Sequence, residues 1–356
     1  MDGVSVRRRT LLMAALAAAT PGAYALALRA LQFPRDFGSH PDLHTEWWYI
    51  TGHVQSEGRE LGFQLTFFRS RIDETQHMKS AFAARQIVFA HAAVTDLRGG
   101  RLLHDQRIAR AGFGVAEAEE SDTRLRLHDW SLQRDTATGR YTARLPSDEF
   151  GLALEIAPTQ PVLLQGNAGL SRKGPDASQA SYYYSEPQLA VTGRIALQGQ
   201  TLDVKAGTAW LDHEWSDALL HPDAVGWDWI GMNLDDGSAL TAFHLRRADG
   251  SALWSGGSWR PEGGATRSFR ADEVRFDAQR RWTSPRTQSS YPVQWAVRTP
   301  SGDFTVHALL DDQELDSLGS TGAVYWEGLS ELRDAKGHRV GRGYLEMTGY
   351  ATRLRF

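Results

Sequence analysis

The sequence predicts an all-β protein whose antiparallel strands form a sandwich or a barrel. Apolar residues alternate with period two over many short stretches. Gly, Asp and Asn turn signals separate these stretches at a spacing of about 8–12 residues, without long helical periods between them. The chain of 356 residues is too long for one ordinary core, so we expect two domains, and two similar β-barrels in tandem fit this length.

The clearest strand covers residues 62–69. Phe63, Leu65 and Phe67 share one face, and the opposite face is also partly apolar, as in a barrel wall. Further strands are expected over residues 86–96, 125–127, 141–145, 152–156, 227–233, 240–246, 304–310 and 343–350. Short helices are expected over residues 80–85 and 311–318.

Composition excludes several classes of protein. The formal net charge of -4 gives no electrostatic basis for binding nucleic acid. The chain has no cysteine, which excludes disulfides, thiolate zinc sites, iron–sulfur clusters, a cysteine nucleophile and a lipid-modified N-terminal cysteine. Its 12 tryptophans are the strongest departure from ordinary composition, and a buried indole N–H needs a partner.

The N-terminus resembles an export signal over residues 1–27. Arg7–Arg9 precede an Ala-rich apolar run, and the small-residue pattern Ala23–Ala27 follows it. Paired arginines before a mildly apolar run indicate twin-arginine export. The alternative is a membrane anchor, but the run is shorter than the roughly 20 apolar residues that span a bilayer. We therefore expect a periplasmic or secreted protein without a stable membrane span.

Three segments concentrate aromatic, acidic and histidine side chains: residues 40–52, 210–215 and 227–229. In a strand, alternate residues share a face. Asp212 should therefore lie beside Glu214, and His213 beside Trp215. The same rule pairs Glu46 with Trp48, Trp47 with Tyr49, and Trp227 with Trp229. We expect the three segments to meet around one cavity with apolar walls and acidic groups.

A carboxylic acid surrounded by indoles has a raised pKa and can stay protonated. An indole face can also stabilise a developing cation. Together these groups suit acid chemistry on an apolar substrate, such as protonation of a C=C bond. The alternative is a buried structural network in which the carboxylates accept backbone hydrogen bonds and the histidines are satisfied inside a core.

Other chemistries are less well supported by the residue pattern. His40 and His44 have metal-ligand spacing for a helix, with Glu46 nearby, but Pro41 and the extended residues that follow argue against a helix. We predict no metal and no cofactor. The chain has no Gly-x-Ser-x-Gly elbow, P-loop or dinucleotide fingerprint, and the glycine-rich residues 166–175 are expected to form a plain loop.

The sequence resembles the AttH-like, or carotenoid 1,2-hydratase-like, family over nearly the whole chain after the N-terminal signal. The matching motifs occupy residues 33–36, 40–41, 46–52, 65–69, 183–185, 210–215, 226–229, 325–328 and 343–350. This resemblance implies two lipocalin-like β-barrel domains, over residues 33–216 and 217–356. It also implies handling of an apolar small molecule, which in some members is a carotenoid hydrated across its terminal double bond without a cofactor.

In the hydratases a His-x-Trp pair and a Tyr-x-Asp pair on a neighbouring strand form the acid site. His213 and Trp215 match the first pair, whereas residues 241–245 contain no Tyr-x-Asp and offer His244 as a replacement acid. The candidate catalytic residues are Asp212, His213, Glu214 and His244. The candidate ligand-binding residues are Glu46, Trp47, Trp48, Tyr49, Tyr183, Tyr184, Trp215, Trp227 and Trp229.

These observations favour an exported protein that binds an isoprenoid, a polyene or a lipid. One alternative is a cofactor-free hydratase, isomerase or cyclase that acts on a C=C substrate. Another is an accessory component of an ABC-type exporter, with ABC transporter components as partners and no chemistry of its own.

Overall fold

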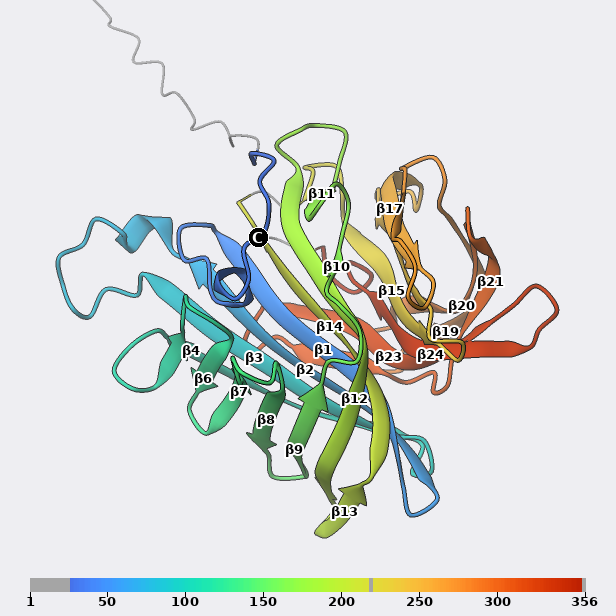
Figure 1. Ribbon diagram of the computed structural model, residues 1–356, viewed down its shortest axis with the longest axis horizontal. Helices are drawn as coiled ribbons and strands as arrows, with labels where there is room; N and C mark the ends of the chain where they lie inside the picture. The colour runs from blue at the N-terminus through green and yellow to red at the C-terminus, as the bar shows by residue number, and fades with distance from the viewer. Residues whose placement is uncertain (1–25, 218–219, 354–356) are drawn as a thin grey trace, which may run out of the picture.

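The computed structural model describes residues 26–217 and 220–353 (Figure 1). Residues 1–25, and with them most of the expected export signal, lie outside this part of the chain. Among the described residues, no helix has the length and apolar character needed to cross a membrane.

The fold is all-β, as predicted, with two antiparallel sheets that match the lipocalin-like architecture. The strands of the first sheet are β1 (Thr45–Ser56), β2 (Arg59–Arg71), β3 (Gln86–Asp96), β4 (Arg101–Arg110), β5 (Ala116–Ala118), β6 (Arg124–Leu127), β7 (Trp130–Arg134), β8 (Tyr141–Pro146), β9 (Phe150–Ala157), β10 (Leu163–Leu164), β11 (Leu170–Arg172), β12 (Ala180–Leu197), β13 (Gln200–Val204) and β14 (Ala206–Ser216). Two short 3-10 helices, η1 (Arg35–Phe37) and η2 (Asp73–Thr75), accompany them.

The second sheet contains the remaining strands of the described chain. They are β15 (Gly226–Leu234), β16 (Ala239–Arg246), β17 (Ala252–Arg260), β18 (Arg267–Phe269), β19 (Arg275–Thr283), β20 (Ser290–Thr299), β21 (Gly302–Ala308), β22 (Glu314–Ser317), β23 (Ala323–Arg333) and β24 (Arg339–Met347). Their order is β18-β17-β16-β15-β24-β23-β21-β20-β19, and β22 pairs with β23. The sheet encloses its own apolar core, which includes Ile230, Tyr291 and Trp326.

The first sheet curls until its distant strands meet. Its order is β4-β3-β2-β1-β14-β12-β9-β8-β7-β6-β5, with β10, β11 and β13 also paired to β12. Arg107 of β4 lies over the Trp130 ring of β7 at 4.8 Å. The Ser147 hydroxyl, just after β8, donates to Asp105 of β4 at 2.7 Å. These contacts bring the sheet close to a closed barrel around an apolar interior.

The two sheets pack against each other through their central strands. Tyr49 and Trp210 of the first sheet share an apolar cluster with Trp229 and Tyr344 of the second. The approach is close at Gly231, where an added Cβ would lie 2.3 Å from the Trp229 indole and 3.2 Å from that of Trp210. Glycine at this position therefore allows the indoles to pack across the interface.

Polar contacts also join the sheets. His91 Nδ1 lies 2.8 Å from the Tyr325 hydroxyl, and Asn233 donates to the carbonyl of Ala209 at 3.0 Å. Thr95 donates to Gln313 at 2.8 Å. Because these partners lie far apart in the sequence, the interface depends on both sheets being formed.

The predicted strands are confirmed, with small shifts at the ends of β21 and β24. The helix predicted over residues 311–318 is wrong, since Glu314–Ser317 form β22 and pair with β23. Buried Gln313 explains the change: its side chain accepts a hydrogen bond from the Leu329 amide and donates to the Leu310 carbonyl. The helix predicted over residues 80–85 is also wrong, since this stretch is a turn and an extended loop.

Candidate functional site

Strand alternation divides the aromatic and acidic segments between two environments. In the pairing of β1 with β14, Trp48 lies opposite His213 and Tyr49 lies opposite Asp212. Neighbouring residues on each strand point to opposite faces of the sheet. One face points into the first barrel and the other points toward the second sheet.

A cavity of about 440 Å³ lies between the two sheets. Its lining is mainly aromatic and aliphatic. The aromatic residues of the lining are Trp47, Tyr49, Phe68, Phe89, Tyr183, Trp227, Trp229, Phe243 and Tyr325. Its acidic residues are Glu74, Asp212, Glu214, Glu327 and Glu346, and its basic or histidine residues are His44, Arg71, His91 and Lys173.

The lining residues form rows across the strands, because side chains paired in register share a face. In the first sheet, one row runs through Phe89, Phe68, Trp47, Glu214 and Tyr183. A neighbouring row runs through His91, Thr66, Tyr49, Asp212 and Ser185. In the second sheet, a row runs through Phe243, Trp229, Glu346 and Glu327. Carboxyl groups from both sheets thus meet aromatic rings in one cavity.

Asp212 is buried and fully hydrogen-bonded. It accepts from the hydroxyls of Tyr183 at 2.7 Å and Ser185 at 2.5 Å, and from the Trp210 indole at 2.6 Å. Burial raises its pKa to about 7, although these hydrogen bonds act in the opposite direction; the charge of Glu214 raises it further. Burial therefore favours the protonated form of Asp212 relative to an exposed aspartate.

Glu214 differs from Asp212 because it has a cationic partner. Lys173 Nζ lies 2.9 Å from its carboxylate, and Ser181 donates to it at 2.5 Å. The same ammonium lies over the rings of Tyr183 and Phe243, at 4.6 and 4.5 Å from their centroids. This ion pair, only 9% and 5% exposed at its two side chains, fixes one corner of the cavity.

The second sheet supplies two further acids, Glu346 and Glu327. Burial raises the pKa of Glu346 to about 7, while a hydrogen bond from the Trp227 indole opposes the shift. Burial, together with the charge of Glu346, raises the pKa of Glu327 well above its usual value. The sequence reasoning missed both acids, although the alternation Tyr325-Trp326-Glu327 resembles the aromatic-acid pattern of β1.

The Tyr49 hydroxyl and Glu327 form a buried polar pair on the cavity wall. Burial and the neighbouring carboxylates raise the pKa of Tyr49, and its interaction with Glu327 opposes the effect of burial on the carboxyl. Neither the Tyr49 hydroxyl nor Glu327 Oε1 makes a second hydrogen bond among the described residues. The pair therefore places polar atoms inside an otherwise apolar space.

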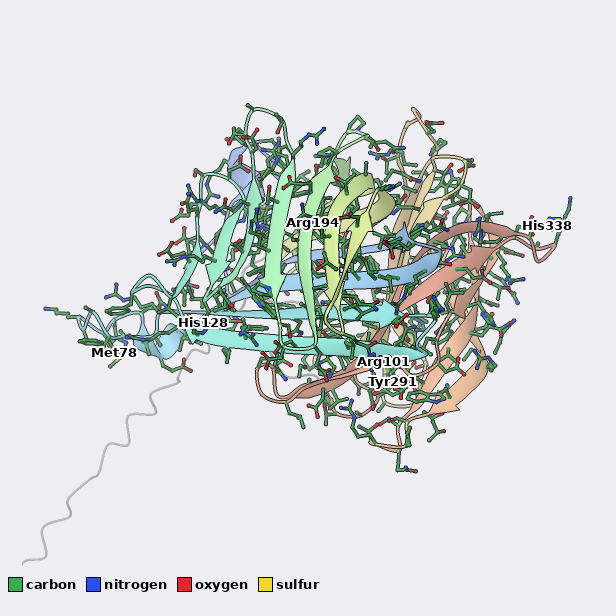
Figure 2. All side chains as sticks on the ribbon, turned by 90° about the horizontal axis from the view of Figure 1, so that it is seen from below. Met78, Arg101, His128, Arg194, Tyr291 and His338 are labelled. Carbon is green, nitrogen blue, oxygen red and sulfur yellow. The ribbon has the colours of Figure 1, made fainter. Side chains whose placement is uncertain are left out.

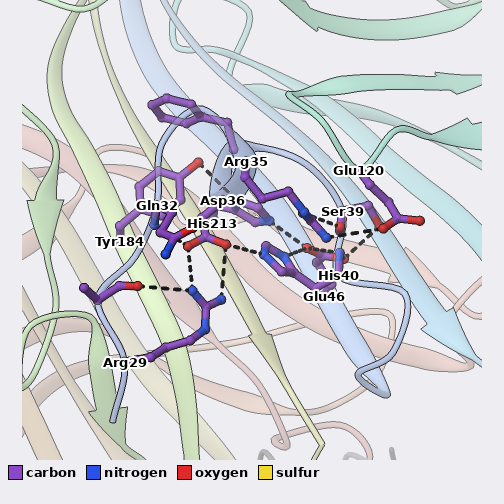
Figure 3. A network of polar contacts seen from close by, with 12 residues as sticks. Arg29, Gln32, Arg35, Asp36, Ser39, His40, Glu46, Glu120, Tyr184 and His213 are labelled. Atoms are coloured by element: carbon purple, nitrogen blue, oxygen red, sulfur yellow. Dashed lines mark hydrogen bonds and ion pairs between the residues drawn. The ribbon is translucent and has the colours of Figure 1, made fainter. Parts of the chain in front are cut away.

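The opposite face of β1 and β14 holds a separate polar network inside the first barrel (Figure 3). Glu46 is fully buried and lies 2.7 Å from His40 Nδ1, 2.9 Å from His213 Nε2 and 2.8 Å from Arg69 Nε. Asp36 holds the other ring nitrogen of His40 at 2.9 Å. Burial alone would raise the pKa of Glu46, but the hydrogen bonds from His213 and His40 outweigh it and lower that pKa well below its usual value.

Indole rings cover both histidines of this network. Trp215 stacks on His40 with ring centroids 3.9 Å apart and an interplanar angle of 4°. Trp48 stacks on His213 at 4.4 Å. The network thereby ties the N-terminal segment that carries Asp36 and His40 to strands β1 and β14.

Donor atoms of His40, Glu46 and His213 all lie within 4.8 Å of one another, which is close enough to hold a metal ion. Each of these atoms is already engaged in a hydrogen bond, and the Arg69 guanidinium occupies the second oxygen of Glu46. The arrangement is complete as a hydrogen-bond network.

His244 lies on the core side of the second sheet and does not line the cavity. Its Nε2 atom is 2.5 Å from Asp228, which also pairs with Arg246 at 2.8 Å and accepts from Tyr350 at 2.9 Å. Its ring stacks on Phe276. The structure therefore does not bring His244 together with Asp212.

The predicted site residues separate into three groups. The cavity is lined by Trp47, Tyr49, Tyr183, Asp212, Glu214, Trp227 and Trp229. The interior of the first barrel holds Glu46, Trp48, Tyr184, His213 and Trp215. The core side of the second sheet holds His244.

The His213 environment predicts acid-sensitive stability. Burial lowers the pKa of His213 from 6.5 to about 4, although the bond to Glu46 acts in the opposite direction. Between these values the unfolded chain binds a proton that the folded chain does not, so the free energy of unfolding should fall as the pH falls. The substitution His213→Gln should reduce this slope by up to about 1.4 kcal/mol per pH unit.

Urea denaturation at a series of pH values measures the slope. Other buried histidines, including His91 and His53, will maintain part of it. His338→Gln, at an exposed hairpin, is the matched control. An unchanged slope in His213→Gln would contradict the assignment.

Comparisons with known proteins agree with the fold and place the chain in a family. A crystal structure from Nitrosomonas europaea assigned to AttH shares 48% sequence identity, covers 94% of this chain and 100% of its own, and has a TM-score of 0.84. Kievitone hydratase from Nectria haematococca has a TM-score of 0.71 at 13% identity, over 92% and 94% of the two chains. CghA with Sch210972 has a TM-score of 0.55 at 12% identity, over 87% and 89%.

Comparison with curated proteins gave no significant match. The model of the family described as AttH-like matches residues 24–350. The chain therefore belongs to the AttH-like family.

Proposed function

We propose that the protein binds an apolar small molecule, such as an isoprenoid, a polyene or a lipid, in the cavity between its two sheets. The observation that carries this proposal is the cavity itself, with about 440 Å³ of space and walls rich in aromatic rings. Small-molecule sites typically enclose about 300–1,000 Å³ and combine apolar walls with a few placed polar groups.

The polar groups of the cavity suggest how a ligand would be oriented. Tyr49 and Glu327 form a buried polar pair, and Glu346 lies next to Glu327 across β23 and β24. A hydroxyl or carbonyl group on an otherwise apolar molecule could pair with these atoms. Such pairing would fix the orientation of the molecule in the cavity.

A second candidate function is acid catalysis on a C=C bond without a cofactor. The pKa values of Asp212 and Glu346 are raised to about 7, so each can donate a proton near neutral pH. Donation to an alkene would form a C–H bond and a carbocation, which the Trp227 and Trp229 rings could stabilise. Addition of water and return of a proton to the carboxylate would complete a hydration.

The relatives support this second candidate only by analogy. One protein of the same fold is named as a hydratase, and another is described with the compound Sch210972. At 13% and 12% identity this similarity concerns the fold, and function depends on the site.

We also propose that residues 1–27 act as a twin-arginine signal peptide and that the protein is periplasmic or secreted. The paired arginines before an apolar run, and the small-residue pattern that follows it, support this proposal. Export should fail when Arg7 and Arg8 are both changed to Lys, and N-terminal mass spectrometry of the periplasmic fraction tests this; mature protein from that double variant would contradict it.

Ligand binding should depend on the cavity indoles. Trp229→Ala removes one wall and should weaken binding of a conjugated polyene fatty acid by at least about tenfold. Quenching of tryptophan fluorescence measures the affinity. Trp282→Ala, on β19 and outside the cavity lining, is the matched control. A protein that responds to no polyene, isoprenoid or fatty acid would contradict the proposal and favour the accessory role.

Catalysis should depend on the acids and on pH. Asp212→Asn or Glu346→Gln should lower turnover of an isoprenoid alkene by about 100-fold or more while binding persists. The rate should also fall as the pH rises above about 7, because the proton-donating form is lost. Product mass, increased by one water, measures turnover, with exposed Glu155→Gln as the control. Equal turnover in both cavity variants would exclude these acids as donors.

A further inference from the structure

Large apolar side chains gather at a projection of the first sheet. Phe82, Phe113 and Met78 are 72%, 58% and 44% exposed. Met78 and Phe82 belong to the loop between β2 and β3, and Phe113 follows β4. We call these three residues the apolar tip. In Figure 2, Met78 marks one end of the molecule and His338 the opposite end.

The apolar tip is held in place by contacts within the projection. Phe82 and Phe113 stack with centroids 5.4 Å apart and an interplanar angle of 11°. Arg110 lies over the Phe113 ring at 4.3 Å and donates to the Phe82 carbonyl at 2.7 Å. Arg85 donates to the Met78 carbonyl at 2.7 Å. These contacts hold large apolar side chains in solvent. Exposed apolar patches of this kind are typical of surfaces that bind a partner.

The charge around the apolar tip is positive. Lys79 and Arg85 are exposed, and the sequence has no acidic residue over residues 76–85. Acidic Asp73 and Glu74 lie at the base of the loop in η2, and Asp73 pairs with Arg71 at 3.2 Å. Apolar side chains beside basic ones are typical of segments that enter the interface of an anionic membrane.

The apolar tip also adjoins the cavity. Ile72 begins the loop that carries Met78 and Phe82, and it lines the cavity together with Ile87 and Ile108. Further in, Phe68 and Phe89 stack at 4.6 Å and line the same space. The loop that carries Met78 and Phe82 therefore starts at the apolar lining of the cavity.

We propose that the apolar tip docks on a lipid bilayer that carries anionic headgroups, so that an apolar ligand can pass between the bilayer and the cavity. The ligand part of this inference rests on the proposed binding function, because an apolar ligand partitions into membranes. The docking itself rests on the exposed rings, the basic side chains and the start of their loop at the cavity lining. A protein with an apolar patch of its own is the other possible partner. The experiments below distinguish docking on a bilayer from docking on a protein.

The absence of cysteine from the sequence allows a single reporter to be placed at will. Ala81→Cys, at an exposed position beside Phe82, would carry an environment-sensitive fluorophore. Vesicles of phosphatidylcholine with phosphatidylglycerol should shift its emission to the blue. The same fluorophore at Ala335→Cys, on the exposed hairpin next to His338, should not respond.

Charge and apolar contact contribute separately to docking. Each basic side chain near an anionic surface contributes roughly fivefold to binding. Binding should therefore be more than about tenfold tighter to vesicles with phosphatidylglycerol than to phosphatidylcholine alone, and should weaken in high salt. The double substitution Phe82→Ser and Phe113→Ser should abolish docking, whereas Leu28→Ser, also at an exposed apolar residue (60%), should not.

The outcomes distinguish docking from ligand binding. The double serine variant should still bind a dispersed polyene fatty acid, since neither Phe82 nor Phe113 lines the cavity. The docking proposal is overturned if the Ala81 reporter stays silent on anionic vesicles, or if Ala81 and Ala335 reporters respond alike. It is also overturned if the exposed rings instead mediate self-association, measured by sedimentation, without vesicle binding. If the wild-type protein binds vesicles but no polyene, the proposed function is overturned and the docking proposal stands.

Discussion

The antiparallel pairing of β1 with β14 is the interaction on which the rest of the structure depends. Its register runs without a break from Thr45 opposite Ser216 to Gln55 opposite Ala206. Because side chains alternate, a slip of one residue would exchange every side chain between the two faces. The register therefore decides that Glu46 and His213 lie within the first barrel while Tyr49 and Asp212 face the second sheet.

The two faces use carboxylates in opposite ways. Glu46 has cationic and hydrogen-bonding partners on several sides, and its charged form is stabilised. Glu327 and Glu346 accept hydrogen bonds from neutral side chains only, and the effect of burial outweighs these bonds and favours the neutral forms. A buried carboxylate with a charged partner typically has a structural role. A buried carboxyl group with a raised pKa is typical of binding and catalytic sites. This contrast separates a structural centre from a candidate ligand site more clearly than residue type does.

Much of the fold could be predicted from the sequence because its signals are local. Period-two alternation and turn residues located β2, β3, β15 and β16, and alternation also placed Asp212 and Glu214 on one face. The cavity composition depends on contacts between distant strands, which local patterns do not encode. Glu346 comes next to Glu327 and Trp229 only through the pairing of β24 with β23 and β15. The helix expected over residues 311–318 failed for the same reason, since pairing with β23 overrode local preference.

The cavity has one wall from each sheet, and each sheet has its own apolar core. A molecule bound in the cavity would therefore contact both sheets at once, through β1 and β14 of the first and β15 and β24 of the second. By thermodynamic linkage, a molecule bound to both walls would stabilise the interface between the sheets. Separation of the two sheets would then release the bound molecule. A partner that opens the interface would release it without unfolding either sheet.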